Sequence, residues 1–272
     1  MLYENDDFQV LDRPGNNRNE VWITFSYAGA RYGVGEFFLK PRECDLVHII
    51  AKRDHWYQSP YIWPVLQAIL HRTSQQNRYL FGSSMGGFGA LAYSAFLQPK
   101  AILSVCPQVL LDQPQDFDGR WHGLWSGLPP IRKDARIGLS RNARVYIVSD
   151  PYLWEDRHHV DALKDFGNVR RLEFPFGDHE IMATLNELRQ WQTIADRIVT
   201  ENENFEDLRA AYMANRRSTS RYYHALARRF FVAGKYDKAE PLLRKAVSID
   251  DTFRYGHLCL EVCESKKQAA AS

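Results

Sequence analysis

The chain has 272 residues, of which 45% are hydrophobic and 25% are charged, the balance of an ordinary globular protein. Its 35 basic and 33 acidic residues give a formal net charge of +2, which excludes the basic footprint of a nucleic-acid-binding protein. The N-terminal segment MLYENDD is acidic and lacks the features of a signal peptide, and no apolar run is long enough to cross a bilayer. We therefore expect a cytoplasmic protein with no membrane span.

The cysteines and histidines fit neither a metal centre nor a disulfide framework. The spacing of Cys44, Cys106, Cys259 and Cys263 matches no common zinc pattern, and a chain of this length can bury a core without disulfides. The adjacent pair at 158–159 lies in a predicted helix, where neighbouring side chains point in different directions. We expect buried free thiols, a solvated histidine pair, no metal and no cofactor.

Short β-branched runs alternate with helical patterns over the first two-thirds of the chain. The predicted strands cover residues 21–27, 46–51, 78–81, 101–106, 144–149 and 169–174. The predicted helices cover residues 60–74, 86–96, 156–165 and 180–199. Such alternation indicates an α/β fold with a mainly parallel sheet and helices on both faces. Residues 8–11 are expected to add an antiparallel edge strand.

From residue 201 onward the pattern is helical throughout. Aromatic, leucine and small residues recur there at positions 223, 226, 227, 230, 234, 236, 239, 243 and 246. These offsets resemble one tetratricopeptide repeat, whose small residues let two antiparallel helices approach closely. A lone repeat cannot bury its own face, so we expect it to stack on helices at 204–213 and 253–264, followed by a frayed tail. The predicted domains are 1–200 and a helical extension at 201–272.

A glycine-rich turn, GSSMG at residues 82–86, joins the strand predicted at 78–81 to the helix predicted at 86–96. A nucleophile at a sharp strand-to-helix turn has a strained backbone, and small residues on either side relieve the crowding. The turn lifts the side chain of Ser84 above the sheet edge, at the positive end of the helix. The flanking strand and small-residue helix favour a nucleophile over the alternative, a tight turn with an idle serine.

These features resemble the α/β-hydrolase superfamily over about residues 20–199. That family orders its triad as nucleophile, acid and histidine. Asp150 directly follows the strand at 144–149, and His179 lies in the loop after the last predicted strand, so the resemblance implies the triad Ser84, Asp150 and His179. Asp156 is the alternative acid. Asp178, beside the histidine, is expected to be a turn residue.

The proposed triad needs an oxyanion hole made of two N–H donors. The turn supplies the N–H of Met85, and the loop after the strand at 21–27 is expected to supply the second, from Ala28 or Gly29. This loop lacks the His-Gly pair that is common in lipases. A backbone donor requires no particular side chain, so the departure leaves the choice between the two residues open.

Three short segments resemble a bacterial subgroup of the superfamily found beside glycan-building or glycan-modifying systems. They are RDHWY at 53–57, PQ at 107–108 and DGRW at 118–121. This resemblance implies that Arg53 lines the substrate site and binds an anionic group; the alternative is an Arg53–Asp54 pair that fixes the loop. In an insert at about 110–141, Trp121 and Trp125 either stack on sugar rings or acyl chains or anchor the insert.

The sequence thus predicts a serine hydrolase that cleaves an ester, with an O-acyl group on a carbohydrate as one candidate substrate. An acyltransferase with the same triad is the alternative, since both share the nucleophile chemistry. A third hypothesis is an inactive scaffold whose C-terminal helices bind a protein partner. The order of Ser84, Asp150 and His179 favours the enzymes over the scaffold.

Overall fold

The computed structural model describes residues 1–112, 118–129 and 131–271. The chain divides into two compact units. The first comprises Met1–Ser149, Trp154–Leu172 and Trp191–Glu203, and the second comprises Asp150–Leu153, Glu173–Gln190 and Asn204–Ser272. The boundary near residue 200 that the sequence suggested stays a prediction.

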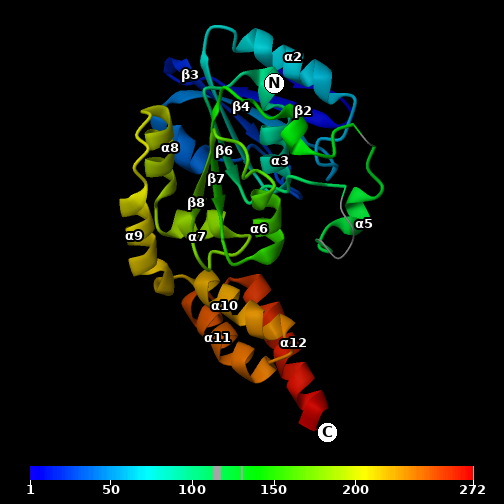
Figure 1. Cartoon of the computed structure of the whole chain (residues 1–272), viewed down its shortest axis with the longest axis vertical. Coiled ribbons are helices and arrows are strands. Elements are labelled where there is room, and N and C mark those ends of the chain that lie inside the picture. Colours follow the sequence, from blue (N-terminus) through cyan, green and yellow to red (C-terminus); the bar gives the residue numbers. More distant parts are fainter. Residues whose placement is uncertain (113–117, 130, 272) are drawn as a thin grey trace. The chain divides into compact units, whose positions relative to one another are not determined.

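The first unit is built on an eight-stranded sheet with the order β1-β2-β4-β3-β5-β6-β7-β8 (Figure 1). Its strands are β1 (Tyr3–Glu4), β2 (Phe8–Arg13), β3 (Asn17–Phe25), β4 (Cys44–Ala51), β5 (Asn77–Ser83), β6 (Ala101–Val105), β7 (Arg144–Ser149) and β8 (Val169–Glu173). The five strands from β4 to β7 in this order pair in parallel. The predicted α/β fold with a mainly parallel sheet is therefore confirmed.

The strand predicted at residues 8–11 is present as β2 and pairs antiparallel with β4. It is not the outermost strand, because β1 pairs antiparallel with its other side. The strands β4 and β6 are buried along their whole length, which explains why their sequences read as continuous apolar runs rather than as alternating ones.

Helices cover both faces of this sheet, as parallel strands require. In the first unit they are α1 (Glu36–Leu39), η1 (Lys40–Arg42), α2 (Ile62–Arg72), α3 (Met85–Ala92), α4 (Ser94–Leu97), α5 (His122–Trp125), η2 (Ala135–Gly138), α6 (Trp154–Asp161) and α8 (Trp191–Val199). On one face, Trp191 of α8 packs against Phe38 of α1 and Phe81 of β5. Side chains of α2, α3 and α6 join the core on the opposite face.

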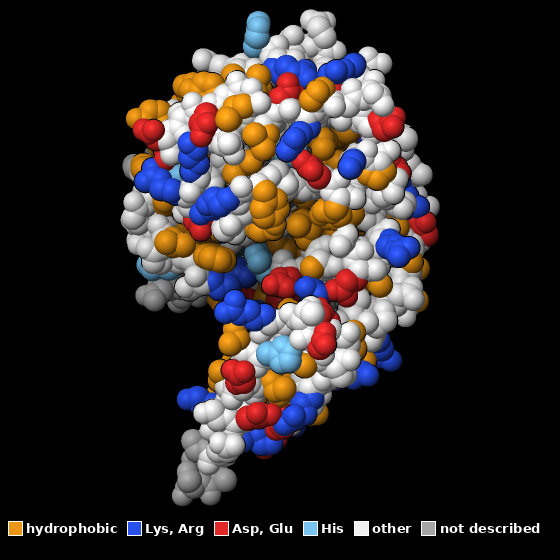
Figure 2. Space-filling model, turned by 180° about the vertical axis from the view of Figure 1, so that it is seen from behind, with side chains coloured by type: hydrophobic (Ala, Val, Ile, Leu, Met, Phe, Trp, Pro, Cys, Tyr) orange, Lys and Arg blue, Asp and Glu red, His pale blue; other side chains and the backbone are white. Residues whose placement is uncertain are grey.

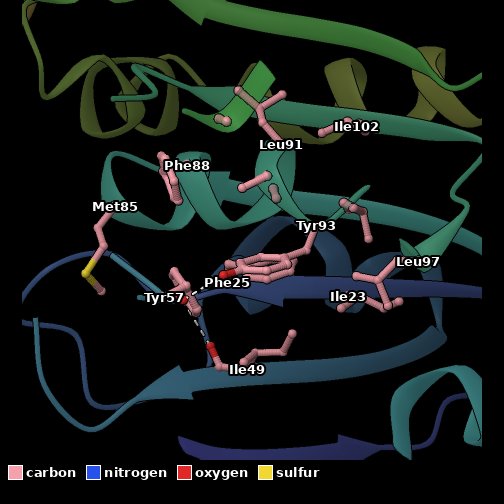
Figure 3. Packing of buried hydrophobic residues seen from close by; sticks show 14 of the residues in the cluster. Ile23, Phe25, Ile49, Tyr57, Met85, Phe88, Leu91, Tyr93, Leu97 and Ile102 are labelled. Atoms are coloured by element: carbon pink, nitrogen blue, oxygen red, sulfur yellow. Dashed lines mark hydrogen bonds between the residues drawn. The ribbon is translucent and has the colours of Figure 1, made fainter. Parts of the chain in front are cut away.

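The helix α3 lies against the centre of the sheet, and all of its residues are buried (Figure 3). Two tyrosine hydroxyls form hydrogen bonds between the sheet and the residues that pack on it. Tyr57 OH donates to Ser26 O at 2.8 Å, and Tyr93 OH donates to Tyr57 O at 2.7 Å. A Cβ at Gly89 would come within 2.6 Å of the Phe25 ring and 2.7 Å of the Tyr57 ring. The small residues of α3 therefore let aromatic rings occupy the space between helix and sheet.

Two of the predicted helices are interrupted in the structure. The one expected at 86–96 ends as α3 and restarts as α4 after Tyr93. The one expected at 180–199 is α7 (Ile181–Glu187) and α8. Between these, Arg189 has a φ of 54°, and Gln190 N–H donates to Leu185 O at 2.9 Å, the closing bond of a left-handed helix end. Periodicity alone does not reveal such a break, because the apolar positions continue on both sides.

The second unit is helical. Besides α7 it contains α9 (Glu206–Asn215), η3 (Arg216–Ser218), α10 (Ser220–Val232), α11 (Tyr236–Ile249) and α12 (Arg254–Ala271). The helices α10, α11 and α12 pack together (Figure 1). The predicted small residues Ala227 and Ala239 are fully buried between them with Leu243 and Cys263. The frayed tail expected at 265–272 was wrong, since α12 continues to Ala271. The likeness to a tetratricopeptide repeat stays a prediction.

The distribution of charged side chains on the surface follows from the small net charge of the chain. Figure 2 shows Lys, Arg, Asp and Glu side chains mixed over the visible face of the described residues, as the small net charge leads one to expect. Among the described residues, none of the four cysteines forms a disulfide, and three of them are buried. Among the described residues, no helix combines the length and apolar character needed to cross a bilayer.

Gly86→Ala is expected to lower the free energy of unfolding by about 3 kcal/mol, because its Cβ would meet backbone rather than a flexible side chain. That atom would stand 2.2 Å from Phe25 O. Gly123→Ala is the matched control, since a Cβ there meets nothing within 4 Å. Urea unfolding of both variants tests the prediction, and equal stability would contradict the close approach of β3 to α3.

Candidate active site

Ser84 occupies the turn between β5 and α3. Its φ of 53° and ψ of −119° are sparsely populated for a residue with a side chain and cost about 1–3 kcal/mol. Its N–H donates to Val105 O at 2.8 Å, which fixes the turn to the neighbouring strand. A strained serine between a parallel strand and a buried helix is the geometry of a nucleophile elbow.

The two glycines of the turn are required by close backbone contacts. A Cβ at Gly82 would lie 2.1 Å from Gly86 O, and a Cβ at Gly86 would lie 2.2 Å from Phe25 O and 3.0 Å from Ser26 O. Any side chain at either position would push α3 away from the ends of β3 and β5. The spacing of glycine, serine and glycine in the sequence follows from this crowding.

Backbone N–H groups beside this turn are candidates for an oxyanion hole. Within the described part of the chain, the N–H groups of Met85 and Ala28 have no hydrogen-bond acceptor. Gly29 N–H instead donates to Asp54 Oδ1 at 2.9 Å, and Asp54 also pairs with Arg31 at 3.0 Å. Of the two donors that the sequence left open, Ala28 is therefore the better candidate, although both assignments stay predictions.

Asp150 follows the last residue of β7 and belongs to the second unit. Its Oδ1 accepts the N–H of Tyr152 at 2.9 Å, and its Oδ2 accepts the N–H of Asp178 at 3.1 Å. Burial raises the pKa of Asp150, and these N–H groups partly oppose that shift. The carboxylate is thus held in one orientation against the loop that contains His179.

His179 lies in the loop after β8, and its N–H donates to Asp178 Oδ1 at 2.8 Å. This loop has a strained backbone, with φ values of 64° at Phe176 and 58° at Asp178. The structure therefore brings together Asp150 and the backbone of the histidine loop, which are far apart in sequence. Ser84 belongs to the other unit, so the convergence of the three side chains stays a prediction.

Asp178 does more than the turn residue that the sequence suggested. Its carboxylate is buried. Oδ2 pairs with His224 Nδ1 of α10 at 3.3 Å, and Oδ1 lies 3.9 Å from Arg228 Nη1. Burial alone would raise the pKa of Asp178, but the hydrogen bond with His224 and the charge of Arg228 lower it. The sequence did not indicate this pair, because Asp178 and His224 are far apart in the chain.

The sequence matches no protein-family model and no curated protein. Its structure is similar to the capsule O-acetyltransferase of Neisseria meningitidis serogroup A, with a TM-score of 0.52 at 16% identity over 73% of this chain and 93% of that one. It is also similar to a carboxylesterase of the thaumarchaeon Nitrososphaera gargenis, with a TM-score of 0.52 at 12% identity over 72% and 96% of the chains. Mouse alpha/beta hydrolase domain-containing protein 10 is similar as well, with a TM-score of 0.52 at 13% identity over 74% of this chain and 98% of that one.

The chain has the α/β-hydrolase fold. The eight-stranded, mainly parallel sheet with its surrounding helices matches these neighbours in fold, and the predicted fold class is confirmed. In this α/β-hydrolase fold, β5 carries the candidate nucleophile, β7 leads to the candidate acid, and β8 leads to the candidate histidine.

A buried ionic cluster ties the insert of this α/β-hydrolase fold to α6. Arg120 Nη2 donates to Asp118 Oδ2 and to Asp156 Oδ1, both at 2.7 Å. His159 accepts the N–H of Leu110 at Nδ1 (3.3 Å), so Nε2 donates to Asp118 Oδ2 at 3.4 Å. Asp156, the alternative acid, therefore has a structural partner. The expectation of two solvated histidines was half wrong, because His158 is exposed and His159 is buried.

The tryptophans of the insert pack against the body. Trp125 is only 2% exposed and meets Trp56 edge-on, with the ring centroids 5.9 Å apart. Trp121 is half-buried, 5.6 Å from the same ring. These contacts favour the anchoring alternative over stacking on a ligand. Arg53 is exposed and pairs with Asp7 rather than with Asp54, and its role at a substrate site stays a prediction.

Arg120→Met is expected to lower the free energy of unfolding by about 3 kcal/mol, because two buried carboxylates would lose their shared cation. Burial alone would raise the pKa of Asp118, yet Arg120 and His159 hold it well below its usual range. Arg136→Met, which removes a half-exposed pair with Asp134, is the control and should cost less than about 1 kcal/mol. Urea unfolding of both variants measures the difference, and equal losses would contradict the buried cluster.

Proposed function

We propose that this protein is a serine hydrolase that cleaves an ester through an acyl-enzyme formed on Ser84. The carrying observation is the strained turn at Ser84, between β5 and α3 and fixed to β6 by its own N–H. Strain of this size persists where the surrounding structure over-determines it, and it is characteristic of catalytic positions. The fold and the motif together support ester chemistry.

In the proposed reaction, Ser84 Oγ attacks the ester carbonyl carbon while His179 accepts the hydroxyl proton. The N–H groups of Met85 and Ala28 stabilise the oxyanion of the tetrahedral intermediate, each donor contributing about 3 kcal/mol. The intermediate collapses, the bond to the leaving oxygen breaks, and His179 returns the proton to the departing alcohol. Water then attacks the acyl-enzyme by the same steps and releases the acid.

Asp150 is the proposed acid that orients His179 and stabilises its positive charge. Two observations support this choice over Asp156. The carboxylate of Asp150 accepts the N–H of Asp178, next to the histidine, whereas Asp156 pairs with Arg120 at 2.7 Å. A carboxylate already neutralised by a guanidinium has less negative charge to offer an imidazolium.

An acyltransferase is the second candidate. Its acyl-enzyme would be attacked by an acceptor hydroxyl in place of water, with no change to the triad. The similarity in fold to a capsule O-acetyltransferase favours this candidate and suggests O-acyl groups of a carbohydrate as the substrate class for either reaction. Hydrolysis and transfer are distinguished by whether added acetylated and free sugars yield acetate or a new sugar ester.

Ser84→Ala should abolish labelling by a fluorophosphonate and lower ester turnover by about a millionfold. Ser83→Ala, one position earlier at the end of β5, is the matched control and should keep both. The measurement combines mass-spectrometric mapping of the label with hydrolysis of p-nitrophenyl esters. A folded wild type that takes no label would support the inactive scaffold with a partner on the C-terminal helices.

Asp150→Asn should lower turnover by about ten-thousandfold, because the amide cannot hold the productive tautomer of the histidine. Asp156→Asn should reduce turnover far less while lowering stability, since it weakens the pair with Arg120. Turnover normalised to the labelled fraction separates the two effects. The reverse order of losses would identify Asp156 as the acid.

A further inference from the structure

We propose that His224, in α10 of the helical segment, is a positioning residue for the loop that contains His179. This inference rests on the proposed function, because it assigns His179 the role of the catalytic base. It gives the C-terminal helices a part in the reaction other than recruiting a partner.

Asp178 lies between the proposed acid and the proposed base. Its backbone N–H donates to Asp150 Oδ2 at 3.1 Å, and its Oδ1 accepts the N–H of His179 at 2.8 Å. One residue therefore contacts both the proposed acid and the backbone of the proposed base. A change in its φ or in its side-chain rotamer would move both groups.

The conformation of Asp178 is stabilised by a neighbouring side chain. Its φ of 58° lies in the left-handed region, which is unfavourable for a residue with a Cβ, although less so for aspartate than for most. The ion pair of its Oδ2 with His224 Nδ1, at 3.3 Å, fixes the side chain in a site where Asp178 is only 8% exposed. Charge-assisted hydrogen bonds of this kind are stronger than neutral ones.

The position of His224 is in turn fixed by contacts with α12 and the residue before it. The ring packs edge-on against Phe253 and Tyr255, with centroids 5.3 and 5.2 Å away. Cys259 Sγ of α12 lies 3.8 Å from His224 Nε2. Contacts therefore run from α12 through His224 to Asp178, and displacement of α12 would be felt at the histidine loop.

The charge of His224 is part of this arrangement. Burial by itself would lower the pKa of His224, but the hydrogen bonds with Asp178 and Cys259 raise it to about 9. Besides Asp178 and His224 themselves, the titratable and charged groups around this pair are Arg228 on α10 and Tyr255 and Cys259 on α12. Because the folded pKa is raised, the pair is fully formed at pH 7 and is lost as the pH rises through about 9.

The test compares His224→Gln with His257→Gln in the full chain. His257 lies on α12 and bonds to the carbonyl of Asp251 at 2.8 Å, so its replacement is a matched control for loss of a histidine in the same unit. Rates of fluorophosphonate labelling of Ser84 and kcat for p-nitrophenyl acetate should fall about tenfold in His224→Gln at pH 7.5. Both rates should stay near wild type in His257→Gln.

Two further measurements distinguish positioning from general destabilisation. The ratio of wild-type to His224→Gln rates should shrink as the pH is raised from 7.5 to 10, because wild-type His224 then loses its proton. Amide hydrogen exchange of the segment 174–181 should be faster in His224→Gln than in wild type or His257→Gln.

Each outcome bears on the proposal. A ratio near one at pH 7.5, or equal losses in both variants, would overturn the positioning role. A wild type whose Ser84 is not labelled by the fluorophosphonate would refute the proposed function. Faster amide hydrogen exchange at 174–181 in His224→Gln would in that case still support stabilisation of the loop by His224. Unchanged amide hydrogen exchange in His224→Gln would also contradict stabilisation of the loop by His224.

Discussion

The close approach of the β3 end to the start of α3 governs the rest of the candidate site. Gly86 has no room for a Cβ beside Phe25 O, and Gly82 has none beside Gly86 O. With both backbones this close, the chain turns from β5 into α3 through Ser84, which has a positive φ. The strain at the serine is thus a consequence of packing at the sheet, which is stable enough to impose it.

A second constraint acts on the loop after β8. Asp178 links Asp150 to the backbone of His179 and is itself held by α10. The proposed acid and the loop of the proposed base are thus contacted by backbone N–H groups and by a buried ion pair. In the proposed arrangement, the helices after residue 204 contribute to the order of this loop.

The predicted site residues differ in how well sequence reasoning reached them. The strained turn at Ser84 was predicted because its motif reflects a local steric requirement, and local requirements leave a pattern in consecutive residues. The partnership of Asp178 with His224 and the cluster of Arg120 with Asp118 and Asp156 left no such pattern, since their members come from separate elements. The break at Arg189 was missed for a related reason: a left-handed helix end formed by a residue other than glycine gives no composition signal.

The sequence by itself determined the alternation of strands and helices, the parallel character of the sheet and the turn at Ser84, because each depends on residues close together in the chain. It also placed small residues where α10 and α11 meet, as the burial of Ala227 and Ala239 confirms. Only the tertiary structure decided that Gly29 N–H is taken by Asp54, that Trp125 is part of the core, and that Asp178 is held by His224. These outcomes depend on which distant groups a fold brings within hydrogen-bond distance, and that information is absent from local patterns.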